Sequence, residues 1–186
     1  MRCLALAVAF AALSAAPSGA TTLVRVSLEE LARQASVVVT GHAEAAHAER
    51  DPATGLIVTV TRLHVTRVIA GADPGADIEV VTLGGHLDGM GQVVEGEARL
   101  APGDDVALFL ESRPRGRARI VAMSEGRFEV SGTAQSPLVT RPGGLAVVDP
   151  ATGHYTTLEP VRLPLEDFAA RVQAARASPS PTGDTP

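Results

Sequence analysis

His86 and Asp88 are the residues of this sequence that are best placed to bind a metal ion. They stand two positions apart, and the segment around them, 84–96, contains five glycines. An imidazole and a carboxylate at this spacing can reach one ion where a flexible backbone lets them converge. A zinc site also needs a third protein ligand, for which His42 and His47 are candidates. A metal-dependent hydrolase that uses His86 and Asp88 is therefore one hypothesis for the function.

The rest of the sequence favours a protein without catalytic residues or a cofactor. Isolated loop histidines more often contact solvent than a metal. No serine stands in a Gly-x-Ser-x-Gly motif, and the chain contains no lysine. Asp104 and Asp105 follow Pro102 and Gly103, a pattern typical of a turn. We therefore expect no cofactor, no bound metal and no enzymatic activity.

Four arginines, at every second position from Arg113 to Arg119, crowd one predicted hairpin. Arg117 and Arg119 would project from the same face of a strand, because side chains alternate along it. Guanidinium groups bind phosphate and carboxylate groups through paired hydrogen bonds. Arg113, Arg115 and Arg117 are therefore candidates for binding an envelope component or an acidic partner. The alternative is a hairpin tip whose charges contact only water.

A mainly β domain with a helix at each end is expected to hold these residues. Ser27 and Glu30 form the N-terminal cap of a short helix that ends near residue 35. Pro164 begins a second helix, in which Phe168 belongs to an apolar face with helical spacing. Runs of β-branched residues separated by turn residues predict strands. These strands cover 36–44, 56–69, 78–83, 106–111, 118–123, 127–130, 145–148 and 154–158.

The strand pattern predicts a small antiparallel OB-like barrel or sandwich. In 56–69 the spacing of apolar residues shifts near Thr61 and Arg62, which predicts a bulge of the kind that lets a strand curl into a barrel. Segments 106–111 and 118–123 are expected to pair. The prediction is a single domain over 21–177, followed by a disordered proline-rich tail over 178–186.

The first twenty residues are typical of an export signal that is removed. Arg2 supplies the positive charge, 3–16 form an apolar segment too short to span a bilayer, and Ser18-Gly19-Ala20 is a small-residue cleavage site. Cleavage there gives a mature chain that starts at Thr21 and has no cysteine, since Cys3 is the only one. We therefore expect an exported protein, periplasmic or secreted, with no membrane span after cleavage.

Composition argues against nucleic acid as a partner. The formal net charge is −5, and aromatic residues make up 3% of the chain. A negative net charge repels the phosphate backbone, and few aromatic faces are left for stacking on bases.

Five short segments, in this order, resemble a family of exported bacterial proteins with no assigned activity. They are Ala35-Ser36-Val37-Val38-Val39-Thr40-Gly41, Val65-Thr66-Arg67-Val68-Ile69-Ala70-Gly71, Gly84-Gly85, Pro102-Gly103-Asp104-Asp105 and Gly126-Arg127-Phe128. The same order is similar to netrin-like modules, whose OB-type barrel is shared by tissue inhibitors of metalloproteinases. Those inhibitors present an amino-terminal cysteine to the target's zinc, whereas here the mature chain starts at Thr21. The resemblance therefore implies a barrel that is protease-inhibitor-like by fold and a binding role, while the cysteine on which inhibition depends is missing.

Loops and one curved face form the contact surface of OB-type barrels, so the glycine-rich segment 84–96 is the expected binding rim. The prediction is an exported, non-catalytic binding module whose partner is an unknown protein or envelope component. Its candidate contact residues are Gly84, Gly85, His86, Asp88, Arg113, Arg115 and Arg117.

Overall fold

The computed structural model describes residues 23–24, 26–143, 146–148, 152–157 and 160–178. The predicted export signal over 1–20 lies outside the described residues, as does the predicted tail apart from Ser178. None of the helices among the described residues is long and apolar enough to cross a membrane.

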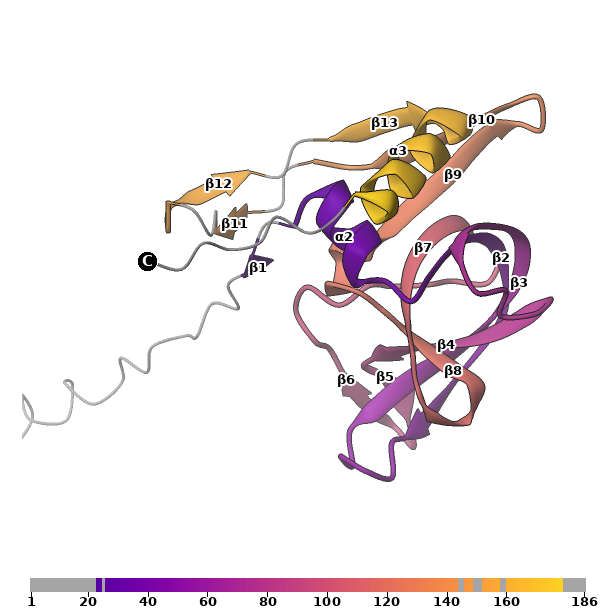
Figure 1. Ribbon diagram of the computed structural model, residues 1–186. Coiled ribbons are helices and arrows are strands. Elements are labelled where there is room, and N and C mark those ends of the chain that lie inside the picture. The colour runs from indigo at the N-terminus through magenta and orange to yellow at the C-terminus, as the bar shows by residue number, and fades with distance from the viewer. Residues whose placement is uncertain (1–22, 25, 144–145, 149–151, 158–159, 179–186) are drawn as a thin grey trace, which may run out of the picture.

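Five strands close into a barrel (Figure 1). They are β2 (Val37–Arg50), β3 (Ile57–Gly71), β4 (Asp77–Leu83), β7 (Asp105–Ser112) and β8 (Arg117–Ile120). The order around the barrel is β2-β3-β4-β8-β7, and β7 pairs back to β2. This confirms the predicted small, mainly β barrel. It also confirms that 106–111 pairs with the segment that follows the turn over 113–116.

One pairing in the barrel is parallel, so the sheet is mixed rather than wholly antiparallel. β4 and β8 run in the same direction, while the other neighbouring pairs of the barrel are antiparallel. A ring with an odd number of strands cannot alternate direction all the way round. A closed barrel of five strands must therefore contain a parallel pair.

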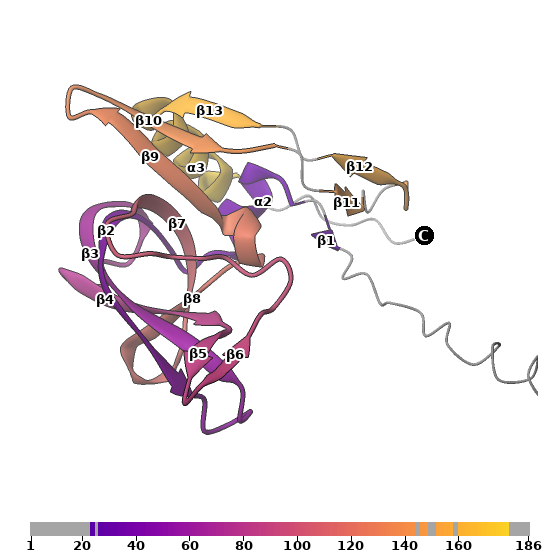
Figure 2. The same ribbon diagram turned by 180° about the vertical axis from the view of Figure 1, so that it is seen from behind.

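The sheet continues past β7 into β9 (Arg127–Thr133), β10 (Ser136–Arg141) and β13 (Val161–Pro164). Two helices, α2 (Leu28–Gln34) and α3 (Leu165–Ala177), pack against each other, and α3 contacts β10. α3 lies in front of β10 in Figure 1 and behind it in Figure 2, so α3 covers one face of this extension, and α2 packs against α3 and β7. The helix cap is as predicted, since Ser27 Oγ accepts a hydrogen bond from the Glu30 N–H at 3.1 Å.

Two small sheets complete the described structure. β1 (Leu23–Val24), β11 (Ala146–Val148) and β12 (Tyr155–Thr157) form one of them, to the side of the barrel (Figure 2). The antiparallel pair β11–β12 matches the predicted hairpin over 145–148 and 154–158, of which Leu145 and Leu158 lie outside the described residues. The other is a short hairpin of β5 (Gly85–Leu87) and β6 (Met90–Gln92), which occupies most of the segment predicted as a glycine loop.

β7 separates two hydrophobic cores, because both of its faces are buried. Leu108 and Leu110 belong to the core inside the barrel, whereas Phe109 belongs to the core beneath the helices. There Phe109, Phe128 and Phe168 form a cluster with ring centroids 5.3–5.8 Å apart. Short 3-10 turns, Pro114–Gly116 and Met123–Gly126, flank β8.

The predicted bulge is present, but on the opposite strand. The register between β2 and β3 shifts between Ala43 and Ala45, which face Leu63 and Arg62 on β3. Glu44 is left without a ladder partner. An extra residue increases the local bend of the strand that carries it. β3 itself pairs with β4 without a register shift from Val58 to His64, so the change in apolar spacing near Thr61 and Arg62 is not itself a bulge.

Candidate functional site

A groove of about 500 Å³ lies on the outer face of the barrel, between two turns. One turn joins β2 to β3 and the other joins β7 to β8. The apolar part of the lining comes from Val58 on β3 and from Val81 and Leu83 on β4, and Arg113, Arg115, Arg117 and Arg119 line it as well. We call it the arginine groove. The structure therefore brings the predicted arginine cluster onto an apolar surface rather than leaving it at an isolated tip.

Arg117 is committed to structural contacts within the protein. Its Nη1 lies 2.6 Å from Glu49 Oε1, and its Nε lies 2.9 Å from Glu79 Oε2. The hydrogen bond from Arg117 lowers the pKa of Glu49 below its ordinary value. A charged pair at this distance holds both side chains in place, so Arg117 shapes the groove more than it offers a free charge.

Arg115 is the cation in the groove that has no ion pair with any described residue. Arg113 pairs with Glu111 at 2.5 Å, and Arg119 lies 4.0 Å from Glu97. Arg115 is exposed and has a φ of +66°, in the left-handed region that non-glycine residues seldom adopt. The turn therefore presents a charged side chain that is free to bind an external anion.

The other wall of the groove is a rigid turn with an acidic residue. Asp51 accepts hydrogen bonds from the Ala53 N–H at 3.0 Å and the Thr54 hydroxyl at 2.9 Å. These bonds, the Ala53 N–H first, lower the pKa of Asp51. Asp51 therefore acts mainly in forming the turn, as Asp commonly does.

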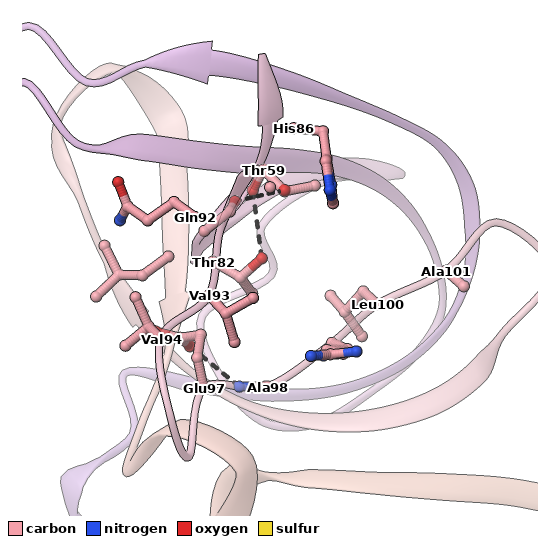
Figure 3. A pocket seen from close by; sticks show the side chains of 14 residues that line it. Thr59, Thr82, His86, Gln92, Val93, Val94, Glu97, Ala98, Leu100 and Ala101 are labelled. Carbon is pink, nitrogen blue, oxygen red and sulfur yellow. Dashed lines mark hydrogen bonds between the residues drawn. The ribbon is translucent and has the colours of Figure 1, made fainter. Parts of the chain in front are cut away.

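A second cavity, of about 340 Å³, lies between the β5–β6 hairpin and residues 97–101 (Figure 3). Gly84, Gly85 and His86 line it. A Cβ at Gly85 would lie 2.7 Å from Thr59 Oγ1, and the φ of Gly85 is +139°. Glycine is therefore needed at position 85 because the hairpin lies so close to β3, and this requirement is independent of any ligand in the cavity.

The predicted pair of His86 and Asp88 has no third ligand among the described residues. Asp88 sits at the turn between β5 and β6, with a φ of +51°. Among the described residues, a different group, Glu44, His64 and Asp77, is close enough together for three of its atoms to bind one metal ion. His47 cannot help, because Ala48 faces the hairpin and neighbouring strand residues point to opposite faces.

Glu97 is a buried carboxylate that the sequence did not single out. Its side chain is 3% exposed, and its Oε1 accepts a hydrogen bond from the Ala98 N–H at 3.2 Å. Its Oε2 has no hydrogen-bond partner among the described residues. Figure 3 shows Glu97 and His86 on opposite sides of the cavity. Glu97 stands between Gly96 and Ala98, with Glu95 and Arg99 nearby, and this context carries no signal that distinguishes a buried glutamate from an exposed one.

A row of four side chains crosses the outer face of the barrel at the end away from the arginine groove. Asp105 on β7 pairs in register with His42 on β2, His42 with His64 on β3, and His64 with Asp77 on β4. We call these four residues the histidine row. His42 Nδ1 lies 2.8 Å from Asp105 Oδ1, and His64 Nδ1 lies 3.1 Å from Asp77 Oδ1.

Sequence reasoning noted His42 as a candidate ligand and Asp105 only as a turn residue, and it missed His64 and Asp77, because the four strands are far apart in the chain. The alternation of polar residues in each strand was the signal, but it places side chains on a face without saying which strands are neighbours.

Comparison with models of known protein families and with curated proteins found no match to this chain.

Proposed function

We propose that this protein acts outside the cytoplasm as a non-catalytic binding module, and that its arginine groove binds an acidic, extended segment of a partner protein. The observation that carries this proposal is Arg115, an exposed arginine with no ion pair among the described residues, on a groove lined by Val58, Val81 and Leu83. The position of the groove supports it as well. Its two turns and two strands correspond to the loops and face with which OB-type barrels bind ligands.

The lining of the groove favours a partner with both apolar and acidic side chains. Valine and leucine side chains gain from burial against an apolar residue, and a guanidinium group forms paired hydrogen bonds with a carboxylate. Glu49 and Asp51 line the same groove, but Glu49 is paired with Arg117 and Asp51 is bonded to its own turn. Arg115 is therefore the group that would attract a carboxylate. An extended peptide that carries leucine and aspartate at every second position, and so on one face, meets both requirements.

The proposal is tested with a fluorescent peptide that carries leucine and aspartate in turn at every second position, with serine between them, so that both kinds of side chain lie on one face. We expect the mature chain to bind it, with an affinity that falls as salt rises, because exposed charges are screened. Arg115→Ser should weaken binding by roughly tenfold, the loss of about one charged hydrogen bond. The matched control is Arg162→Ser, an exposed arginine on β13, which should bind like the parent chain.

Two results would contradict the proposal. One is equal binding of a peptide in which asparagine replaces every aspartate, since this would remove the role of charge. The other is unchanged binding by the Arg115→Ser chain. Binding of a phosphate-bearing envelope polymer in place of the peptide would keep the groove but change the class of partner.

A further inference from the structure

The bulge in β2 places Glu44 beside two members of the histidine row, His64 and Asp77. The shift of register at Ala43 and Ala45 leaves Glu44 outside the ladder. One ligand atom each from Glu44, His64 and Asp77 then lie within 4.8 Å of one another. Bulges often reorient a side chain in this way beside functional sites. Three strand segments far apart in sequence thus direct one imidazole and two carboxylates to one point.

We propose that Glu44, His64 and Asp77 form a site for a divalent transition-metal ion, with Zn²⁺ as the best fit. Zinc accepts nitrogen and oxygen ligands at about 2.0–2.2 Å in a tetrahedral arrangement, so the donors need to approach to about 3.4 Å of one another. Their side chains are 38–50% exposed, which leaves them room to rotate by this amount. One imidazole with two carboxylates also suits zinc better than Ca²⁺ or Mg²⁺, which prefer oxygen alone.

His42, together with Asp105, which holds it in place, completes the site. His42 is directly opposite His64 in the ladder, and side chains of opposite residues are typically about 5 Å apart at Cβ. Its Nδ1 is held by Asp105, an arrangement that commonly orients metal-binding histidines and leaves Nε2 available. We assign His42, or a water molecule in its place, to the fourth position.

Arg62 competes with the metal for the same carboxylates. Its Nη2 lies 2.8 Å from Asp77 Oδ2, and its Nε lies 3.3 Å from Glu44 Oε2. The Arg62 side chain is 58% exposed, so it can move into solvent when a metal binds. Removal of Arg62 should therefore strengthen metal binding by Glu44, His64 and Asp77. If these residues served only to form salt bridges with Arg62, its removal would only lower the stability of the protein.

The experiment is titration of the mature chain with Zn²⁺ in calorimetry, in a buffer that does not bind zinc. We expect one ion per chain. His64→Gln and Glu44→Gln should each reduce the affinity at least about tenfold, since even changes beside metal ligands cost 10–100-fold. Arg62→Gln should raise the affinity. His86→Gln, a histidine on the β5–β6 hairpin, should bind zinc like the parent chain.

The site is rejected if the parent chain takes up no zinc, or if zinc binding survives both His64→Gln and Glu44→Gln. Loss of binding in His86→Gln would instead assign the metal to the hairpin. Histidine side-chain NMR shifts on zinc addition, expected at His64 and absent at His86, check the same point in the folded parent chain. This inference does not depend on the arginine groove, because Asp77 and Leu83 lie at opposite ends of β4, about 20 Å apart at 3.3 Å per residue.

Discussion

Arg117 and Glu49 join two barrel strands that share no backbone pairing. Arg117 begins β8, Glu49 lies near the end of β2, and their side chains meet at 2.6 Å. A third strand is included, because Arg117 also contacts Glu79 on β4. This contact holds the two walls of the arginine groove relative to each other.

Arg117→Ala should therefore destabilise the protein, while Arg115→Ser should not. Both members of the Arg117–Glu49 pair are about 30% exposed or less, so we expect a loss of about 1 kcal/mol, near the upper end for surface pairs. Arg115 has no such pair, and its loss should change the free energy of unfolding by less than about 0.5 kcal/mol. Urea unfolding of the two variants measures this difference. Equal destabilisation by both would contradict the division between a structural and a binding arginine.

The aromatic cluster should be the main contact that holds α3 on the sheet. Phe168 is 0% exposed and its ring lies 5.3 Å from that of Phe128. Phe168→Ala should cost about 3–5 kcal/mol in the free energy of unfolding, because the cavity cannot fully close. Tyr155→Ala is the control, since Tyr155 is 72% exposed. A small loss for Phe168→Ala would mean that the helix packs only loosely.

Gly41 should be needed because β2 lies close against β3 at this position. A Cβ at this position would lie 2.6 Å from the His64 carbonyl oxygen and 2.8 Å from Leu63 Cγ. Gly41→Ala must move backbone, which we expect to cost about 1–3 kcal/mol, as overpacking does elsewhere. The same shift displaces His64, so zinc affinity should fall with stability. Unchanged urea midpoint and zinc affinity would show that the strands separate freely here.

Acid should weaken the attachment of the two helices. Arg171 contacts Glu29 at 2.6 Å, and Arg67 contacts Glu166 at 2.5 and 3.0 Å. These hydrogen bonds lower the pKa of both glutamates below the ordinary 4.5, and Arg33 adds a smaller effect at Glu29. A lowered pKa means that the contribution to stability is present above pH 4.5 and is lost as the pH falls through the lower folded-state value.

Arg171→Gln tests this pH dependence. The variant should melt below the parent chain at pH 7, and the difference in Tm should shrink as the pH falls through the lowered pKa of Glu29. Thermal unfolding over a series of falling pH values is the measurement. A difference in Tm that does not shrink as the pH falls would mean that Arg171 stabilises the helices through packing alone.

Export should leave a defined amino terminus. If the segment 1–20 is removed as proposed, mass spectrometry of the protein recovered from a cell envelope or culture medium should find a chain that begins at Thr21. Ala20→Tyr places a bulky side chain at the cleavage site and should leave an uncleaved precursor, since this position requires a small residue. Recovery of the intact chain from cytoplasm alone would contradict the export proposal.

Local patterns in the sequence determined the elements of this protein. The Ser27 cap, the apolar face around Phe168 and the β-branched runs predicted both helices and the barrel strands, because each depends on contacts within a few residues. The turn over 113–116 and the pairing of β7 with β8 on either side of it were predicted for the same reason. The bulge was predicted at Thr61 and Arg62, whereas the extra residue, Glu44, lies in β2.

Only the tertiary structure decided which side chains meet. The parallel pairing of β4 with β8 follows from closure of the ring, and no segment taken alone encodes it. The same pairings bring His64, Asp77 and Glu44 together. They also place Arg117 against Glu49, whereas Arg115 has no ion pair in the part of the chain that the structure describes. Alternation along a strand selects a face, whereas register and neighbouring strands are set by contacts between segments far apart in the chain.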